Sequence, residues 1–457
     1  MNLFELVSYN KNLKFIDDEN QSEFTLNDLP EIGFSDESKK LIFAYLDNSI
    51  QSILVFWTLM KSNHCVALLP PNISLHFKSE LESLYKPSYV FDNSREYLET
   101  YSLINEKSIS YFKSINETNI KIHNSIKILI STSGTTGSPK FVKLSEENLI
   151  SNANSITQYL PINEFDVTPL NLPIFYSYGL SVLTSNSLKG GKIVCTNDDV
   201  LKKSFWEKFE KFGFTSFAGV PFVYEMLDRI GFTKKTYSTL KYFTQAGGKL
   251  HENLIKKYGE YALSNKIEFY VMYGQTEATA RMSFLTPKLI LQKTGSIGKP
   301  IPNGEFILEE ETNELCFKGL NVFGGYVEKP VDLEIFEKNE VLKTGDIAKV
   351  DEDGFFYITG RIKRFTKLFG NRINLDEVEN IISKQFDIIV KSIGINDKTL
   401  IIFCSDSSVD LRNIMQFISN ELKLHISVIK TQHIEQFPLT NNGKINYSAL
   451  TEIYATK

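Results

Sequence analysis

The amino-acid sequence predicts an α/β protein with two domains of unequal size. Its 457 residues exceed what one hydrophobic core usually organises. Short apolar runs that end in glycine-, serine- or threonine-rich turns recur through most of the chain, as in β-sheets layered with helices. The last part repeats strand and helix patterns on a smaller scale. We therefore expect a large N-terminal domain over residues 1–360 and a smaller α+β domain over residues 361–457.

The composition is that of an ordinary globular protein. Hydrophobic residues make up 42% and charged residues 23%, and the net charge of −5 offers no basic surface for nucleic acid. The N-terminus has no basic start, and the longest apolar run, residues 53–60, is too short to span a bilayer. Four cysteines stand far apart and form no metal-binding motif: Cys65, Cys195, Cys316 and Cys404. These features predict a reduced, cytoplasmic protein without a membrane span.

A strand and a phosphate-binding loop are predicted in residues 126–140, IKILISTSGTTGSPK. The apolar start indicates a short buried strand, and the glycines and hydroxyls after it let consecutive N–H groups cradle an anion. The spacing differs from the GxxxxGK[ST] loop of nucleotide hydrolases. A plain surface loop is the alternative. A helix should start at Ser145, followed by two acids. The candidate phosphate ligands are Thr132, Ser133, Gly134, Thr135, Thr136, Gly137 and Lys140.

Two central segments stand out, one for its aromatic residues and one for its paired glycines. Residues 172–183, LPIFYSYGLSVL, are rich in aromatics and read most simply as a core strand entering a helix. Residues 242–250, YFTQAGGKL, place Gly247 and Gly248 directly after an apolar strand, where the backbone can approach a flat ligand. An ordinary turn explains the paired glycines almost equally well.

The strand predicted at residues 267–272 ends in YGQTEATAR. Ligands collect at the carboxyl ends of strands in open α/β sheets. Here Tyr273 can stack on a purine, Gly274 allows a turn, Thr276 offers a hydroxyl, and Glu277 offers a carboxylate suited to Mg²⁺. On its own, a Tyr-Gly turn followed by an acid would be unremarkable, and the segment indicates part of a nucleotide site because it occurs together with the phosphate loop.

A small β-barrel is predicted in residues 295–326, which are rich in glycine and proline and hold short apolar runs. Beyond it, LKTGD ends in Asp346, a carboxylate that can accept hydrogen bonds from two vicinal hydroxyls such as those of ribose. The alternative is an ordinary Gly-Asp turn.

The C-terminal domain should contain a helix capped by Asn374, strands over residues 388–395, 400–404 and 426–429, and a helix over residues 410–424. The chain then reaches FPLTNNGKINYSAL, in which a tight turn presents Lys444. By itself such a lysine is usually a solvated surface residue.

Five of these segments, in this order, resemble the AMP-forming adenylating enzymes, which include acyl-CoA and aryl-CoA synthetases, carrier-loading adenylation domains and luciferases. TSGTTGSPK is similar to the family's phosphate loop and YGQTE to its second signature. The resemblance implies a large adenylating domain and a small domain that rotates about a hinge at Lys363, where the family often has Asp. It also implies that Arg361 contacts ribose or phosphate.

The resemblance implies the following roles. Lys444, Glu277 and Thr276 are catalytic, Glu277 also holding Mg²⁺, while Tyr273 and Asp346 hold the adenosine of ATP. The acid pocket includes Phe175, Tyr176, Gly179 and Gly248; many CoA ligases carry His at the position of Tyr176. Lys249 replaces a residue that is commonly small.

The implied activity is ATP-dependent formation of an acyl-adenylate, followed by transfer of the acyl group to a thiol. Amino-acid-activating relatives pair the substrate's ammonium with an Asp at the position of Gly179, and this chain has no acid within residues 172–188. Since a buried ammonium needs a carboxylate, we expect an acid without an α-amine. Coenzyme A is the favoured acceptor. The alternatives are a stand-alone phosphopantetheine carrier protein or a nucleotide-binding module without turnover.

Overall fold

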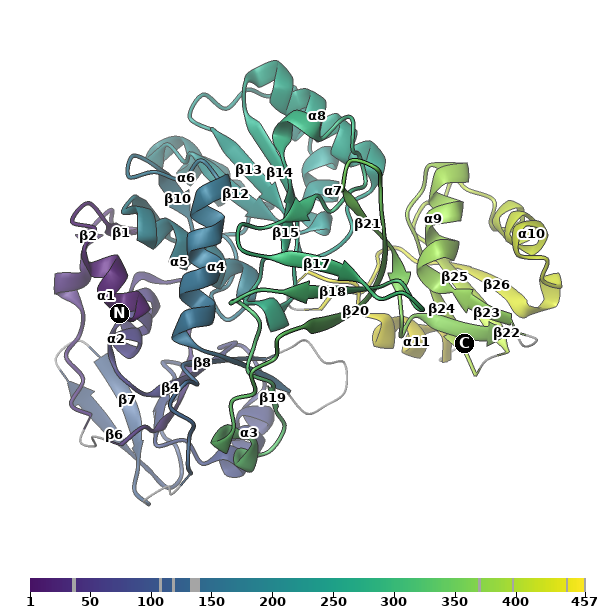
Figure 1. The fold of residues 1–457 in the computed structure, drawn as a ribbon. Helices are drawn as coiled ribbons and strands as arrows, with labels where there is room; N and C mark the ends of the chain where they lie inside the picture. Colours follow the sequence, from purple (N-terminus) through teal and green to yellow (C-terminus); the bar gives the residue numbers. More distant parts are fainter. Residues whose placement is uncertain are drawn as a thin grey trace.

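A computed structural model of the chain describes residues 1–34, 38–106, 109–116, 120–131, 140–368, 371–396, 398–440 and 443–455 (Figure 1). It has the predicted α/β architecture: layered sheets and helices form the larger part, and a smaller α+β unit follows at the C-terminal end. Within these ranges, no helix combines the length and apolarity needed to cross a bilayer.

The first large sheet has eight strands and carries the predicted phosphate-loop segment. Its central strands β3, β4, β5 and β8 run parallel, whereas β8 and β9 form an antiparallel hairpin whose connection includes the predicted phosphate ligands. In spatial order the strands are β19 (Tyr326–Val327), β9 (Phe141–Leu144), β8 (Ile128–Ser131), β4 (Cys65–Leu69), β3 (Leu41–Tyr45), β5 (Tyr89–Phe91), β7 (Ile109–Ser114) and β6 (Tyr101–Glu106).

Two further sheets complete the layered part. A five-stranded sheet has its first three strands parallel and consists of β12 (Ser216–Gly219), β13 (Tyr242–Gln245), β14 (Glu268–Tyr273), β15 (Ser283–Leu285) and β16 (Lys299–Pro300). A four-stranded sheet consists of β10 (Val167–Pro169), β11 (Lys192–Cys195), β1 (Lys14–Asp17) and β2 (Glu23–Phe24).

Helices α4 (Glu146–Tyr159) and α5 (Ser177–Lys189) lie between the two large sheets and contribute to both main cores (Figure 1). The α4 helix begins where predicted, with a capping box in which Ser145 accepts from the Asn148 N–H. Its Leu149 packs with the eight-stranded sheet, whereas Ile156 packs with the five-stranded sheet. Because both faces are covered, these helices set the distance between the sheets.

The remaining helices cover the sheet faces and join the strands. They are α1 (Leu3–Ser8), α2 (Ile50–Lys61), α3 (Leu75–Tyr85), α6 (Lys203–Phe212), α7 (Pro221–Arg229) and α8 (Glu252–Asn265), with the 3-10 helices η1 (Leu26–Asp28), η2 (Phe232–Lys234), η3 (Thr276–Ala278), η4 (Pro287–Leu289) and η5 (Pro330–Glu334).

The predicted small barrel is a four-stranded antiparallel sheet that extends well beyond residue 326. It consists of β17 (Glu305–Leu308), β18 (Glu314–Lys318), β20 (Leu342–Val350) and β21 (Phe356–Arg361). The segment between β18 and β20 leaves this sheet, because β19 pairs with β9 of the eight-stranded sheet. Tyr326 is thereby brought beside the phosphate-loop hairpin.

The C-terminal unit has its own hydrophobic cores. It consists of β22 (Phe365–Leu368), β23 (Asn371–Asn374), α9 (Leu375–Phe386), β24 (Val390–Ile395), β25 (Thr399–Cys404), α10 (Leu411–Leu422), η6 (Ile426–Val428), β26 (Ile429–His433) and α11 (Tyr447–Ala455). Asn374 caps α9 as predicted. The prediction of a strand at residues 426–429 was wrong. His425 caps a 3-10 turn there, and the strand begins only at Ile429.

Candidate active site

Asp346 is the centre of a hydrogen-bonded cluster formed by three separate segments. Its carboxylate is only 3% exposed and accepts from the Tyr273 hydroxyl at 2.5 Å and from Gln275 Nε2 at 3.2 Å on Oδ2, and from Arg361 Nε at 2.9 Å on Oδ1. Arg361 is the β21 residue that pairs with Asp346 in the sheet register. The end of β14 and the middle of the β20–β21 hairpin therefore meet at one carboxylate.

Tyr273 stays protonated beside this carboxylate. Burial and the adjacent Asp346 both raise the pKa of Tyr273. The Tyr273 ring also packs edge-on against Phe306, at 6.3 Å between centroids. The predicted purine-stacking ring and the predicted ribose ligand thus lie in direct contact.

We expect Asp346→Asn to raise the KM for ATP about 10- to 100-fold, because a buried carboxylate that accepts from charged and neutral donors contributes a charge-assisted bond. ATP-dependent pyrophosphate release, titrated with ATP, measures this change. The control is Glu352→Gln, which removes an exposed acid from the β20–β21 turn. An unchanged KM for ATP in Asp346→Asn would contradict a ribose-binding role.

Glu277 and Lys140 share one aromatic partner. The Tyr326 hydroxyl donates to Glu277 Oε1 at 2.9 Å, and Lys140 Nζ lies 3.6 Å from the centroid of the same ring. Lys140 Nζ is also 3.0 Å from Glu328 Oε1. The position of Tyr326 follows from the pairing of β19 with β9, so the hairpin that carries the phosphate loop also orients the predicted Mg²⁺ ligand.

A tight turn presents Thr276 and Glu277 at the end of β14. The Thr276 hydroxyl is 3.3 Å from the Ser177 hydroxyl at the start of α5. Gly274 is required in this turn, since a Cβ there would lie 1.6 Å from the Ala280 carbonyl oxygen. The turn thus brings the second signature against the helix that begins in the aromatic-rich segment.

The predicted acid-pocket residues do not all lie together. Tyr176 packs beside Gly247, whose φ is 86° and whose Cβ, if present, would lie 2.7 Å from the Tyr176 hydroxyl oxygen. Phe175 instead packs against the core of the eight-stranded sheet. Gly179 packs its backbone against Pro173, and Gly248 faces the Pro221 ring. Tyr176, Gly247 and Gly248 therefore form one group, which excludes Phe175.

Lys444 reaches this group from the C-terminal unit. The Gly443 N–H donates to the Thr440 carbonyl oxygen, and the Thr440 N–H donates to that of Lys444, which closes a turn against Val220. Lys444 Nζ lies 5.8 Å from the centroid of the Tyr176 ring. Burial and the cation Arg361 lower the pKa of Lys444, while Glu277 and Asp346 act in the opposite direction. Its ammonium is thus within the electrostatic reach of both acids.

Lys249 and Lys363 lie at the junction between the two parts. Lys249 Nζ donates to Asn380 Oδ1 of α9 at 2.9 Å and so points to the C-terminal unit. Lys363 is exposed in the turn between β21 and β22. Next to it, Arg364 donates to Glu379, Ser392 and Tyr447 and organises the small unit directly after that turn.

Six predicted phosphate ligands lie outside the described residues: Thr132, Ser133, Gly134, Thr135, Thr136 and Gly137. Sequence reasoning also missed two residues of the site, Tyr326 and Gln275. Gln275 belongs to YGQTEATAR, and its polar side chain beside predicted ligands was a usable signal. Tyr326 gave no local signal, because its role depends on the pairing of β19 with β9.

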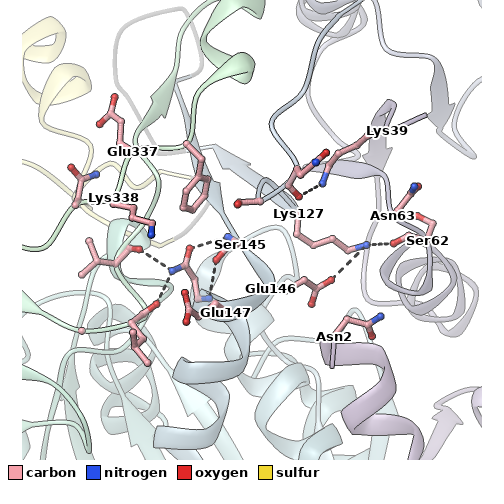
Figure 2. Close-up of a pocket in the computed structure, with 18 of the residues that line it drawn as sticks. Asn2, Lys39, Ser62, Asn63, Lys127, Ser145, Glu146, Glu147, Glu337 and Lys338 are labelled. Carbon is pink, nitrogen blue, oxygen red and sulfur yellow. Dashed lines mark hydrogen bonds and ion pairs between the residues drawn. The ribbon is translucent and has the colours of Figure 1, made fainter. Parts of the chain in front are cut away.

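A polar cavity of about 1060 Å³ lies at the other end of the β8–β9 hairpin, beside the start of α4 (Figure 2). Figure 2 shows Lys127 directed toward Ser62 and Glu146. The ammonium donates to the Leu59 carbonyl oxygen at 3.2 Å and to that of Ser62. Burial lowers the pKa of Lys127 to about 8, although Glu146 Oε1 at 3.8 Å acts against this.

This lowered pKa predicts a pH-dependent contribution to stability. Between the folded pKa of about 8 and the unfolded value of 10.5, only the unfolded chain binds the proton, so stability increases with pH. Relative to Lys127→Met, the wild type should gain about 2 kcal/mol in the free energy of unfolding between about pH 7.5 and about pH 9.5. Urea denaturation at both pH values measures this. Lys61→Met, which removes an exposed lysine of the same cavity, is the control, and parallel pH curves for wild type and Lys127→Met would contradict the prediction.

Two relatives of this chain are named as CoA ligases. The chain is 24% identical over 425 residues to a 2-succinylbenzoate–CoA ligase of Staphylococcus epidermidis, covering 89% of this chain and 87% of that protein. It is 30% identical over 274 residues to an oxalate–CoA ligase of Arabidopsis thaliana, covering 57% and 53%.

A solved structure has the same fold. The O-succinylbenzoate coenzyme A synthetase of Bacillus subtilis, in complex with ATP and a magnesium ion, superposes with a TM-score of 0.72 at 19% identity, over 98% of this chain and 99% of that one. The sequence pattern of the family described as "AMP-binding enzyme" matches residues 41–327, and the chain therefore belongs to this family.

Proposed function

We propose that this protein joins a carboxylic acid to coenzyme A in two half-reactions. In the first, a carboxylate oxygen attacks the α-phosphorus of ATP, and the bond to pyrophosphate breaks to leave an acyl-adenylate. In the second, a thiol attacks the acyl carbon, its proton passes to solvent, and AMP leaves. The observation that carries this proposal is that Lys444 reaches the Tyr176 ring from the C-terminal unit, where Arg361, Glu277 and Asp346 all act on the pKa of its ammonium.

Different residues of the site bind different parts of the substrates in the first half-reaction. Asp346 and Tyr273 hold ribose and adenine. Lys444 bridges the acid's carboxylate and the α-phosphate, where negative charge builds up during the attack. Lys140, with residues 132–137, holds the β- and γ-phosphates, and Thr276 donates its hydroxyl beside them. Positioning and charge neutralisation then account for catalysis.

The residues present fit a magnesium ion held mainly by substrate. Among the described residues, no set of three His, Cys, Asp or Glu side chains is arranged to hold a metal ion. Mg²⁺ commonly binds through one or two carboxylates together with phosphate oxygens and water. Glu277, oriented by the Tyr326 hydroxyl, would be that carboxylate. When bound, the ion neutralises the phosphate charge.

The second half-reaction requires Lys444 to withdraw. Residues 361–457 would rotate as a domain about Lys363, relative to residues 1–360, and open a path for the thiol. The Lys249–Asn380 hydrogen bond spans these two parts and would break during rotation. In this proposal the acceptor is coenzyme A, and the protein acts in the cytoplasm. The alternative acceptor is a stand-alone carrier protein, whose phosphopantetheine arm carries the same thiol nucleophile, and the experiment must distinguish the two.

The acid carries no α-amine in this proposal. Residues 172–188 contain no carboxylate that could pair with an ammonium. The acids named for the two relatives, 2-succinylbenzoate and oxalate, are both dicarboxylic, so they belong in any substrate panel.

The test is pyrophosphate release by the full chain with ATP, Mg²⁺ and a panel of acids, followed by thioester formation with coenzyme A or with a phosphopantetheinylated carrier protein. We expect acid-dependent pyrophosphate release and a thioester with coenzyme A. If a thioester formed only with the carrier protein, the carrier protein and not coenzyme A would be the acceptor. If the protein bound ATP but released no pyrophosphate with any acid, it would be a nucleotide-binding module without turnover.

A further inference from the structure

Arg281 is a buried cation without an anionic partner. It is 2% exposed and lies between η3 and β15, four residues after Glu277. Across the described residues, no carboxylate lies within ion-pair distance of its guanidinium, and Nε is buried with no hydrogen-bond partner. Burying an unpaired charge is costly, so such a side chain calls for an explanation.

The backbone that holds Arg281 is strained and firmly fixed. Thr279 and Ala280, which precede it, have φ of 56° and 107°, a region that non-glycine residues rarely adopt. Asn321 Nδ2 donates to the carbonyl oxygens of Ala278 at 2.8 Å and Arg281 at 2.9 Å, and Asn152 donates to the latter at 3.1 Å. Two buried amides therefore maintain a strained turn that places this one side chain.

The guanidinium stacks on Tyr178, which lies beside Tyr176 of the proposed acid site. Its Cζ lies 4.0 Å from the centroid of the Tyr178 ring, and the Tyr178 and Tyr176 centroids are 6.4 Å apart. Tyr178 is itself held in place, since its hydroxyl lies 3.0 Å from the Thr244 carbonyl oxygen. Arg281 also acts on Tyr176 directly, because it opposes the burial that raises the pKa of that residue to about 12.

Each ring of this pair therefore has a cation nearby. Lys444 Nζ lies 5.8 Å from the centroid of the Tyr176 ring, and Arg281 Cζ lies 4.0 Å from that of the Tyr178 ring. The cation–π contact offsets only part of the cost of burying Arg281. A purely structural role in this packing would need no charge, whereas a planar guanidinium is well suited to bind a carboxylate with two hydrogen bonds.

We infer that Arg281 pairs with a second carboxylate of the substrate, so that this protein activates a dicarboxylic acid. One carboxylate reacts near Lys444, the carbon skeleton lies along Tyr176 and Tyr178, and the other carboxylate binds Arg281. This inference rests on the proposed function. It also explains why an amino acid would bind poorly, since its ammonium would face a cation instead of an acid.

The test compares each of several diacids, including succinate, glutarate, adipate and phthalate, with its own monomethyl ester, using pyrophosphate release by the full chain. For the preferred skeleton, the wild type should favour the diacid about 100-fold in kcat/KM, mostly through KM. Arg281→Met should reduce this preference to a few-fold, and Arg281→Lys should retain part of it. Arg412→Met, in the exposed part of α10, is the matched control and should keep the wild-type ratio.

The ratio of diacid to ester distinguishes recognition from folding, because a structural defect lowers both activities together. Turnover of esters as efficient as that of diacids by the wild type would overturn the inference and leave the proposed function in place. An equal loss for both substrates in Arg281→Met would also overturn it. No pyrophosphate release with any acid would instead overturn the proposed function itself. The wild-type ratio decides the matter even if Arg281→Met does not fold.

Discussion

Lys444→Ala is expected to lower the rate of adenylation about 100- to 1,000-fold, while the folded protein still binds ATP. The lysine approaches Tyr176, Glu277 and Asp346 from the C-terminal unit, and its ammonium would meet the charge that develops between carboxylate and α-phosphate. Loss of one preorganised donor to such a charge typically costs this much in rate. Single-turnover pyrophosphate release with saturating acid and ATP measures the effect.

The two half-reactions provide the internal control for Lys444. Thioester formation from preformed acyl-adenylate and coenzyme A should stay within a few-fold of wild type, because Lys444 withdraws before that step. Lys256→Ala removes an exposed lysine from α8 and should leave both half-reactions unchanged. An equal loss in both half-reactions would show that Lys444 supports folding or domain position rather than adenylation.

Glu277→Gln is expected to lower the adenylation rate about 100-fold at about 1 mM Mg²⁺, with partial recovery as Mg²⁺ is raised. The amide keeps the size of the side chain and can still contact the Tyr326 hydroxyl, but it removes the charge that attracts the ion. Pyrophosphate release measured over a Mg²⁺ titration, at fixed ATP and acid, reports the change.

Tyr326→Phe tests the orientation of the Glu277 carboxylate without removing its charge. This variant keeps the ring beneath Lys140 and removes only the hydroxyl that donates to Glu277 Oε1. We expect a loss of about 3- to 10-fold, because the carboxylate stays in place and loses only one hydrogen bond that orients it. If Glu277→Gln responded to Mg²⁺ no differently from wild type, Glu277 would not be the ion's ligand.

Local features of the chain could be predicted well because they depend on neighbouring residues. Ser145 and Asn374 cap helices as expected, since a capping side chain bonds to N–H groups two or three positions away. The strand before YGQTEATAR ends where the turn residues begin. The error at residues 426–429 is also local in origin, because the apolar residues there suit a strand but His425 caps a 3-10 turn.

Contacts between distant segments were beyond such reasoning. Neither Tyr326 nor Lys249 carries a local sign of its partner: Tyr326 reaches Glu277 because β19 leaves its own sheet, and Lys249 reaches Asn380 because the C-terminal unit docks beside α8. Phe175 and Tyr176 are neighbours in the chain but pack in different hydrophobic cores, and this too depends on which sheet each ring faces.

The sequence by itself determined the chemical groups of this protein, the order of its motifs and most of its helices and strands, because period, capping and turn chemistry act over a few residues. Only the tertiary structure decided which groups share one site, and it alone revealed that Arg281 is buried without a carboxylate partner among the described residues. The reason is physical: the presence or absence of a partner depends on packing between segments far apart in the chain.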